Sequence, residues 1–228
     1  MSGPFTVLLT RPRPQAASTA RALESRGYGV VEAPLIQPVA LDGWGGSEGI
    51  GAIALTSRSA ARLLAGRPGL AGVPIFAVGE ATAEEARAAG AQCVASADGN
   101  VEDLLALLLR DAKQPVVHIC GADHHGELVE RLRSAGMDAE RWIVYRMVPA
   151  TALPAAVDAD AVVLFSPRTA RIYASLAAGS PWAMVPCAGI SRAVVAELSS
   201  DVRTVVAARP REDALLDALD GLRADVTV

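Results

Sequence analysis

The chain has 228 residues, which is enough for one large domain or two smaller ones with hydrophobic cores. Hydrophobic residues make up 51% and aromatic residues only 4%, so the cores must consist mainly of Ala, Val, Leu and Ile, the usual composition of parallel sheets covered by helices. The formal net charge of −4 argues against a protein that binds nucleic acid through its overall field.

The first half of the chain is predicted to alternate strands and helices. Aliphatic runs mark the strands, and alanine-rich stretches with one apolar face mark the helices. Pro34 and Pro38 interrupt one strand region, which therefore bends or lies at a sheet edge. The predicted order is a strand at residues 6–10, a helix at 15–26, a bent strand region at 30–39, a strand at 51–55, a helix at 59–64, a strand at 74–78, a helix at 81–89, a strand at 91–95 and a helix at 101–110.

The second half is predicted to repeat this alternation. Glycines such as Gly136 again follow predicted helices and supply stop signals. The predicted order is a strand at residues 116–120, a helix at 127–134, strands at 142–148 and 161–165, a helix at 169–177, a strand at 183–187, a helix at 191–198, a strand at 202–207 and a helix at 212–222.

The spacing of matching residues indicates an internal duplication. Matching pairs recur at one offset in the same order along both halves, and one inserted residue changes that offset from 109 to 110. The 109-residue pairs are Leu23/Leu132, Gly27/Gly136, Ala52/Ala161, Ser57/Ser166 and Arg62/Arg171, and the 110-residue pairs are Gly79/Gly189, Glu102/Glu212 and Asp103/Asp213. On this alignment Tyr145 is the counterpart of Ile36, so the two interrupted strands are equivalent elements.

Alternating strands and helices predict α/β domains with parallel sheets covered by helices on both faces. Ligands of such sheets bind at the carboxyl ends of the strands, where helix N-termini present free N–H groups. With two domains, these edges can face each other across a cleft. The residues predicted at this edge are Arg11, Ser57, Gly79, Gly121, Ser166 and Gly189.

Two interpretations of these turns stay open. The glycine-then-hydroxyl turns at Gly79 and Gly189 suit anion binding, but they also fit tight strand-to-helix turns. Ser57 and Ser166 suit helix N-caps, and each is followed by an arginine, at Arg58 and at residue 168, that could bind a ligand. The repetition of Ser and Arg at equivalent turns favours the ligand interpretation more than either turn alone.

Familiar catalytic patterns are missing from the sequence. There is no Gly-x-Ser-x-Gly motif, no phosphate-binding glycine loop and no metal-ligand spacing, and the His124-His125 pair is better explained as an exposed helix start. Three scattered cysteines, no signal segment and no apolar run long enough to span a bilayer predict a reduced cytoplasmic protein. We therefore expect no cofactor, no metal, no membrane partner and no nucleic acid.

Tyr145 is the strongest candidate for a reacting side chain. It lies in the β-rich run at residues 143–149, and a phenol can donate a proton to a leaving group. The alternative is that Tyr145 packs against a neighbouring loop. If the chain is an enzyme, it works mainly by positioning a reactive substrate and stabilising its charges.

Four segments resemble a known family. They are Leu8-Leu9-Thr10-Arg11-Pro12 with Gln15, Leu55-Thr56-Ser57-Arg58-Ser59-Ala60, Pro74-Ile75-Phe76-Ala77-Val78-Gly79-Glu80-Ala81-Thr82-Ala83, and Val144-Tyr145-Arg146. Together they resemble uroporphyrinogen-III synthases, and the similarity covers essentially the whole chain. The family pattern commonly has a threonine where this chain has Met147, a Thr-Ser turn where it has Phe165-Ser166, and Arg-Gly where it has Cys120-Gly121.

The resemblance implies two flavodoxin-like parallel-sheet domains joined by a two-stranded antiparallel connector. Domain 1 is discontinuous and takes residues 1–35 and 150–228, and domain 2 takes residues 42–141. The connector strands are residues 36–41 and 142–149. Tyr145 would then face the cleft from this connector.

The resemblance also implies an activity. Uroporphyrinogen-III synthases are cofactor-free lyases of haem biosynthesis that cyclise hydroxymethylbilane with loss of water and inversion of ring D. Loss of hydroxide gives an azafulvene cation, and ring D inverts through a spiro intermediate. The family tyrosine proposed to assist departure of the hydroxyl matches Tyr145.

The many carboxylates of this substrate suit arginines and helix N-termini. The predicted substrate-binding set is Arg11, Thr56, Ser57, Arg58, Gly79, Gly121, Ser166, Arg168 and Gly189, with Arg146 as a further arginine near the cleft. We expect a monomer that has hydroxymethylbilane as its partner and that makes at most transient contacts with neighbouring enzymes of the pathway.

Two other functions are compatible with the same pattern. One is a non-catalytic two-domain binding protein or sensor for a tetrapyrrole or another polyanion. The other is a solute-binding protein with two lobes and a hinge, against which the missing signal segment counts.

Overall fold

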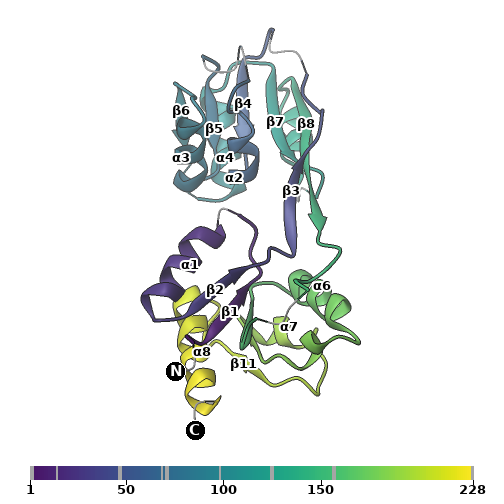
Figure 1. Cartoon of the computed structure of the whole chain (residues 1–228). Coiled ribbons are helices and arrows are strands. Elements are labelled where there is room, and N and C mark those ends of the chain that lie inside the picture. The colour runs from purple at the N-terminus through teal and green to yellow at the C-terminus, as the bar shows by residue number, and fades with distance from the viewer. Residues whose placement is uncertain are drawn as a thin grey trace. The chain divides into compact units, whose positions relative to one another are not determined.

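The protein folds into two compact α/β units. The computed structural model describes residues 3–13, 15–45, 48–67, 69, 72–97, 99–123, 126–155 and 158–226. Unit 1 comprises Met1–Gln37 and Val148–Val228, and unit 2 comprises Pro38–Met147. Each unit has a central sheet with parallel strand pairs and helices packed against it, as Figure 1 shows. The prediction of an α/β fold with parallel sheets is confirmed.

Unit 1 contains the first and last elements of the chain. Its sheet has the strand order β11-β10-β9-β1-β2 in the part of the chain that is described, and every neighbouring pair is parallel. The strands are β1 (Thr6–Leu9), β2 (Gly29–Glu32), β9 (Ala161–Leu164), β10 (Cys187–Gly189) and β11 (Thr204–Val206). The helices are α1 (Gln15–Ser25), α6 (Pro167–Ala177), α7 (Arg192–Val195) and α8 (Glu212–Val226), with a 3-10 helix at Pro181–Met184.

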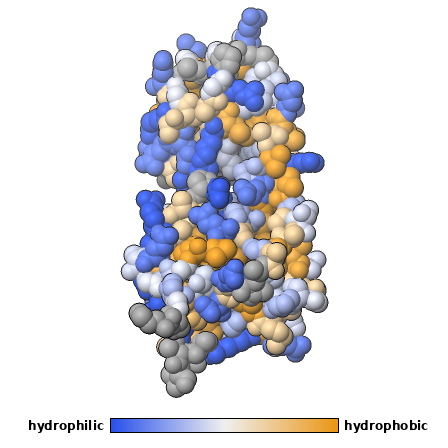
Figure 2. Space-filling view, in the orientation of Figure 1, coloured by the Kyte–Doolittle hydropathy of each residue, from blue (hydrophilic) through white to orange (hydrophobic). Residues whose placement is uncertain are grey.

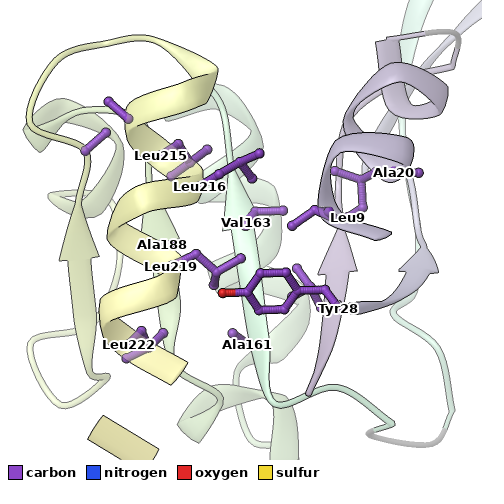
Figure 3. Close-up of a cluster of buried hydrophobic side chains, with 14 of the residues drawn as sticks. Leu9, Ala20, Tyr28, Ala161, Val163, Ala188, Leu215, Leu216, Leu219 and Leu222 are labelled. Carbon is purple, nitrogen blue, oxygen red and sulfur yellow. The ribbon is translucent and has the colours of Figure 1, made fainter. Parts of the chain in front are cut away.

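The sheet of unit 1 has a hydrophobic core on each face. Side chains alternate along a strand, so Leu9 of β1 joins the core beneath α1 and α8, and Leu8 joins the core beneath α6 and α7. Figure 3 shows Leu215, Leu219 and Leu222 of α8 directed at this sheet. Burial on both faces explains why these strands are almost entirely apolar.

Unit 2 has the same kind of layered structure. Its sheet has the order β3-β8-β7-β4-β5-β6 among the described residues, and the pairs from β8 to β6 are parallel. The strands are β3 (Ile36–Ala40), β4 (Ala52–Leu55), β5 (Ile75–Ala77), β6 (Val94–Ser96), β7 (Val116–Gly121) and β8 (Ala139–Pro149). The helices are α2 (Arg58–Arg62), α3 (Glu80–Ala88), α4 (Val101–Asp111) and α5 (Leu128–Ser134). Helices α2 and α3 cover one core, and α4 and α5 cover the other.

The chain passes between the units within two strands. It enters unit 2 between Gln37 and Pro38, inside β3, and returns to unit 1 between Met147 and Val148, inside β8. The strand predicted at residues 142–148 is longer than expected, since β8 begins at Ala139. The segment predicted as a connector strand is therefore continuous with a strand of the sheet in unit 2.

Two predicted strands differ in the structure. The region at residues 30–39 is two strands, β2 and β3, which lie in different sheets on either side of Pro34. The strand predicted at residues 183–187 is wrong, because a 3-10 helix precedes Val185 and β10 begins at Cys187. Trp182 accounts for that difference: its Nε1–H donates to the Pro154 carbonyl at 2.9 Å, and its own carbonyl accepts a bond from the Tyr173 hydroxyl at 2.7 Å.

Across the described residues, every helix is too short or too polar to cross a bilayer. The face of the protein in Figure 2 mixes hydrophilic and hydrophobic residues over both units.

We expect that replacing Leu219 with alanine lowers the free energy of unfolding by about 2–5 kcal/mol, because it leaves a cavity in a close-packed core. Leu219 of α8 is 0% exposed and points at the sheet of unit 1. Met184→Ala is the matched control, since the Met184 side chain is 68% exposed in the same unit. Denaturant unfolding followed by circular dichroism measures both variants, and equal stability of the two would contradict this assignment of the core.

Candidate active site

The residues predicted to bind or react with a ligand lie at the carboxyl ends of parallel strands. Helices that begin at this edge present unpaired N–H groups, which makes it the usual ligand edge of an α/β sheet. In unit 2 the predicted residues are Thr56, Ser57 and Arg58 after β4, Gly79 after β5, Gly121 at the end of β7 and Tyr145 in β8. In unit 1 they are Arg11 after β1, Ser166 and Arg168 after β9, and Gly189 at the end of β10. Each unit therefore has its own candidate edge.

Tyr145 is held by contacts to two other predicted residues. Its hydroxyl lies 3.0 Å from Oγ of Ser57, which is a hydrogen-bond distance. Its ring lies on Gly121, where an added Cβ would be 2.5 Å from Cζ and 2.9 Å from Oη of the tyrosine. The Ala122 N–H donates to the Tyr145 carbonyl at 2.8 Å. Glycine at position 121 is thus required by the position of the ring.

A register shift between β7 and β8 aligns these residues. Cys120 pairs with Ile143, but the next pair is Gly121 with Tyr145, so Val144 is an extra residue in β8. Val144 is fully buried, and Tyr145 is half-buried. Bulges of this kind redirect side chains and are common beside active sites. The bulge is the reason that Tyr145, and not its neighbour, lies opposite the glycine.

The turn that carries Ser57 is fixed at both ends. Oγ of Ser57 accepts the N–H of Ala60 at 3.0 Å and so caps α2, as predicted. The preceding residue, Thr56, has its hydroxyl 3.0 Å from Nε2 of His118, which is 3% exposed in β7. The serine hydroxyl that contacts Tyr145 is therefore held in one position by a helix start and by a buried imidazole.

Arg58 is already engaged by an acidic side chain. Its Nη2 lies 2.7 Å from Oε1 of Glu85 in α3, and Arg62 pairs with the same carboxylate. Burial acts to raise the pKa of Glu85, but the hydrogen bonds from Arg62 and Arg58 outweigh it and leave the pKa below its ordinary value. Glu85 is therefore ionised at neutral pH and balances part of the charge of Arg58.

Gly79 leaves open backbone at the start of α3. It is the N-cap residue, makes no side-chain capping bond, and has an extended conformation that any residue can adopt. An added Cβ at this position would meet nothing within 4 Å. The structure therefore gives no packing reason for glycine here, and the open turn suits the close approach of a ligand.

Unit 1 has a pocket at the ends of β1 and β9. Its volume is about 230 Å³, and Arg11, Phe165 and Ser166 are among its lining residues. The Arg11 guanidinium lies 4.3 Å from the centre of the Phe165 ring and forms an ion pair with Glu212 of α8. It also donates to the Thr19 hydroxyl at 2.9 Å. Arg11 therefore has a structural role in this pocket, and its charge is balanced within unit 1.

Ser166 caps α6 as Ser57 caps α2. Its Oγ accepts the Thr169 N–H at 3.1 Å and lies 2.5 Å from the Thr169 hydroxyl oxygen. The N-cap interpretation is thus confirmed for both serines, and their contact with a ligand stays a prediction. Arg168, in the first turn of α6, is exposed.

Gly189 has a packing reason to be glycine. It is buried in β10, and an added Cβ would be 2.6 Å from a methyl carbon of Val195 and 3.3 Å from one of Val194. These contacts bring α7 close to the sheet. They explain the residue without a ligand, so binding through Gly189 also stays a prediction.

The site has no thiol nucleophile in an ionised state. Burial raises the pKa of Cys120, beside Gly121, to about 11, and Arg141 lowers it only in part. The thiol is therefore protonated at neutral pH. No group of three or more His, Cys, Asp or Glu residues could hold a metal ion in the described part of the chain, and His124 and His125 lie outside the described residues.

Three further residues, His118, Glu85 and Glu212, shape these edges but are not among the predicted site residues. His118 could have been noticed, because it is the one polar residue in the run Val-Val-His-Ile-Cys that forms a buried strand. Nothing in the sequence marks Glu85 and Glu212 as partners of the site arginines, since each looks like an ordinary charge near a helix start or on a helix surface. Their roles depend on partners that are remote in sequence.

These features define a class of protein. The chain is an α/β protein with two units built on parallel strands, each with arginines and hydroxyl groups at the carboxyl edge of its sheet. Unit 2 adds an open turn at Gly79 and one tyrosine held at this edge. This arrangement suits a small anionic ligand and chemistry that depends on positioning and proton donation.

Comparisons with known proteins identify the family. A family model described as uroporphyrinogen-III synthase HemD matches residues 17–217. The chain therefore belongs to the uroporphyrinogen-III synthase family, and its activity is that of a cyclising lyase of haem biosynthesis. No curated protein matches this chain significantly by sequence.

Two solved structures were found to be similar to this chain. Uroporphyrinogen-III synthetase from Helicobacter pylori 26695 has a TM-score of 0.61 at 15% identity, with 96% of this chain and 99% of that chain covered. The wild-type uroporphyrinogen III synthase from Thermus thermophilus has a TM-score of 0.41 at 17% identity, with 98% of each chain covered. The likeness to the Helicobacter pylori protein shows a common fold.

Proposed function

We propose that Tyr145 is the proton donor in the reaction of this enzyme. The reaction closes hydroxymethylbilane to uroporphyrinogen III, with loss of water and inversion of ring D. Loss of the hydroxyl group from the substrate requires a proton at the departing oxygen, because hydroxide is a poor leaving group and water is a good one. A phenol positioned at that oxygen supplies the proton as a general acid.

The contact between Tyr145 and Ser57 is the observation that carries this proposal. Oγ of Ser57 accepts the Ala60 N–H, so one of its lone pairs is in use and its own proton is free to point at the Tyr145 oxygen 3.0 Å away. In that arrangement Ser57 donates to the phenol, and the phenol proton is directed to the substrate. The same bond stabilises the phenolate that forms when the proton leaves.

The other predicted residues bind the carboxylates of the substrate. Arg168 is exposed and able to meet a carboxylate from solvent, and Gly79 offers open backbone at a helix start. Arg11 and Arg58 have internal carboxylate partners, so each shares its guanidinium between the protein and the substrate. Thr56, Gly121, Ser166 and Gly189 complete the proposed set through their hydroxyl or backbone groups.

The two units descend from one duplicated sequence. The order of the strands supports this proposal, since the 109- to 110-residue offset relates β6-β5-β4-β7-β8 of unit 2 to β11-β10-β9-β1-β2 of unit 1, position by position. Gly27 and Gly136, which are 109 residues apart, both have a positive φ after a helix. Arg62 of α2 pairs with Glu85 of α3, and its counterpart Arg171 of α6 pairs with Glu197, two residues after the end of α7.

The strands that join the units form an antiparallel connector between a discontinuous domain 1 and domain 2. Two hydrogen bonds support this proposal: Leu41 N–H donates to the Val144 carbonyl at 2.8 Å, and Ala150 N–H donates to the Leu35 carbonyl at 2.9 Å. The two residue numbers add up to 185 in both bonds, as expected of an antiparallel pair. We propose domain boundaries near residues 35–42 and 141–150, and a cytoplasmic monomer.

Separation of the product isomers tests the proposed function. The protein is incubated with freshly generated hydroxymethylbilane, and the products are oxidised and separated by chromatography. We expect isomer III, which needs inversion of ring D, in place of isomer I, which forms without an enzyme. A control with boiled protein must give isomer I. Isomer I alone from the folded protein would contradict the proposed function.

A further inference from the structure

A second pocket lies at the carboxyl edge of the sheet in unit 1, beyond the one that Arg11 lines. It opens at the ends of β10 and β11 and has a volume of about 350 Å³. Ser191, Arg192 and Arg209 supply its polar lining. None of these three belongs to the predicted binding set, although the pocket occupies the position where parallel sheets bind ligands.

Ser191 differs from the other two serines at equivalent turns. Ser57 and Ser166 use their hydroxyl groups to cap the helices that follow them. Ser191 precedes α7 in the same extended conformation, but its side chain makes no capping bond. Its hydroxyl is half-buried at the pocket and is available to donate to a ligand.

The arginines of this pocket are less fully balanced by carboxylates than Arg11 is. Glu212 balances Arg11 within unit 1. Arg192 is exposed, and no carboxylate pairs with it among the described residues. Arg209 shares the carboxylate of Asp213 with Arg211, at 2.8 and 3.3 Å, in pairs that are largely exposed. Arg192 and Arg209 of the lining and the neighbouring Arg211 outnumber the one carboxylate of Asp213, which leaves a net positive charge beside the pocket.

We propose that this pocket is a subsite for a carboxylate side chain of the tetrapyrrole substrate, bound by Arg192, Arg209 and the Ser191 hydroxyl. The inference rests on the proposed function, which supplies a substrate with many carboxylates. The subsite binds a part of the substrate that does not react, so its contacts are the same in the ground state and in the transition state. Loss of these contacts therefore raises KM and leaves kcat unchanged.

Charge-neutral variants test the subsite. We expect Arg192→Gln and Arg209→Gln each to raise KM for hydroxymethylbilane by about tenfold, the effect of losing one charge-assisted hydrogen bond, with kcat within about twofold of wild type. At higher salt concentration, KM of the wild-type enzyme should move closer to KM of the two variants, because screening weakens the ionic contact that only the wild type makes. Arg21→Gln removes the same charge from exposed α1 in unit 1 and should leave KM unchanged.

A binding assay separates this inference from the proposed function. Uroporphyrin III, the stable oxidised form of the product, is titrated against wild-type and variant proteins, and its fluorescence gives Kd without turnover. We expect Kd to rise by about tenfold in Arg192→Gln and Arg209→Gln and to be unchanged in Arg21→Gln. KM and Kd within about twofold of wild type in both pocket variants would overturn the subsite even if isomer III forms. Formation of isomer I alone, with a Kd that still depends on Arg192, would instead contradict the proposed function and support the subsite.

Discussion

Replacing Tyr145 with phenylalanine is expected to lower kcat by about 100-fold, the lower end of the range for loss of a general acid. The substitution removes the hydroxyl that lies 3.0 Å from Ser57 and keeps the ring that lies on Gly121. The fold should therefore be unchanged, and KM should change little because the proton is needed only as the hydroxyl departs. Single-turnover measurements with freshly generated hydroxymethylbilane give the rate of this step.

Tyr28→Phe is the matched control for a lost phenol. The Tyr28 hydroxyl donates to Asp220 at 2.6 Å in unit 1, and the residue is 4% exposed, so its loss should cost about 1–3 kcal/mol of stability. It should leave kcat of the folded protein unchanged. If Tyr145→Phe keeps kcat within about twofold of wild type, Tyr145 is a packing residue, and the acid must be sought elsewhere.

Local signals in the sequence were sufficient for much of the fold. Ser57 predicted the start of a helix because its hydroxyl satisfies an N–H that the first turn leaves unpaired, and the structure has that bond. Gly27 and Gly136 predicted helix ends because each takes a positive φ that other residues rarely adopt. In these places the residues that decide the conformation are neighbours in the chain.

The sequence was less informative where the deciding partner is remote. The apolar stretch at residues 183–187 looks like a strand, but the bonds of the preceding Trp182 to Pro154 and Tyr173 hold a 3-10 helix at Pro181–Met184. The tertiary contacts override the local β-propensity there.

Contacts between residues remote in sequence matter even more for the candidate site than for the fold. Sequence predicted Ser57 at the carboxyl edge of a sheet and, through the family resemblance, Tyr145 in the connector facing the cleft. It could not predict that they touch, since this depends on the bulge at Val144 and on the missing side chain of Gly121. The ion pair between Arg11 and Glu212 joins residues 201 positions apart, so no local pattern indicated that this arginine is balanced.

Replacing Gly121 with alanine is expected to lower kcat by about 100-fold, the loss that a displacement of about 1 Å can cause at a reacting group. An added Cβ would be 2.5 Å from Cζ of Tyr145, so one of the two must move. The ring is the end of a half-buried side chain, whereas Gly121 is backbone of β7 that pairs with β8. The Tyr145 ring is therefore displaced, and its hydroxyl leaves the position beside Ser57.

Gly51→Ala is the control that separates displacement of the Tyr145 ring from a steric clash elsewhere in unit 2. Its added Cβ would be 2.5 Å from the backbone carbonyl oxygens of Lys113 and Gln114, which cannot rotate away. We expect Gly51→Ala to lose about 1–3 kcal/mol of stability with kcat of the folded protein unchanged. Gly121→Ala should show the opposite pattern, a large loss of kcat with a smaller loss of stability. Full activity in a folded Gly121→Ala protein would mean that the contact between Tyr145 and Ser57 is not needed for the reaction.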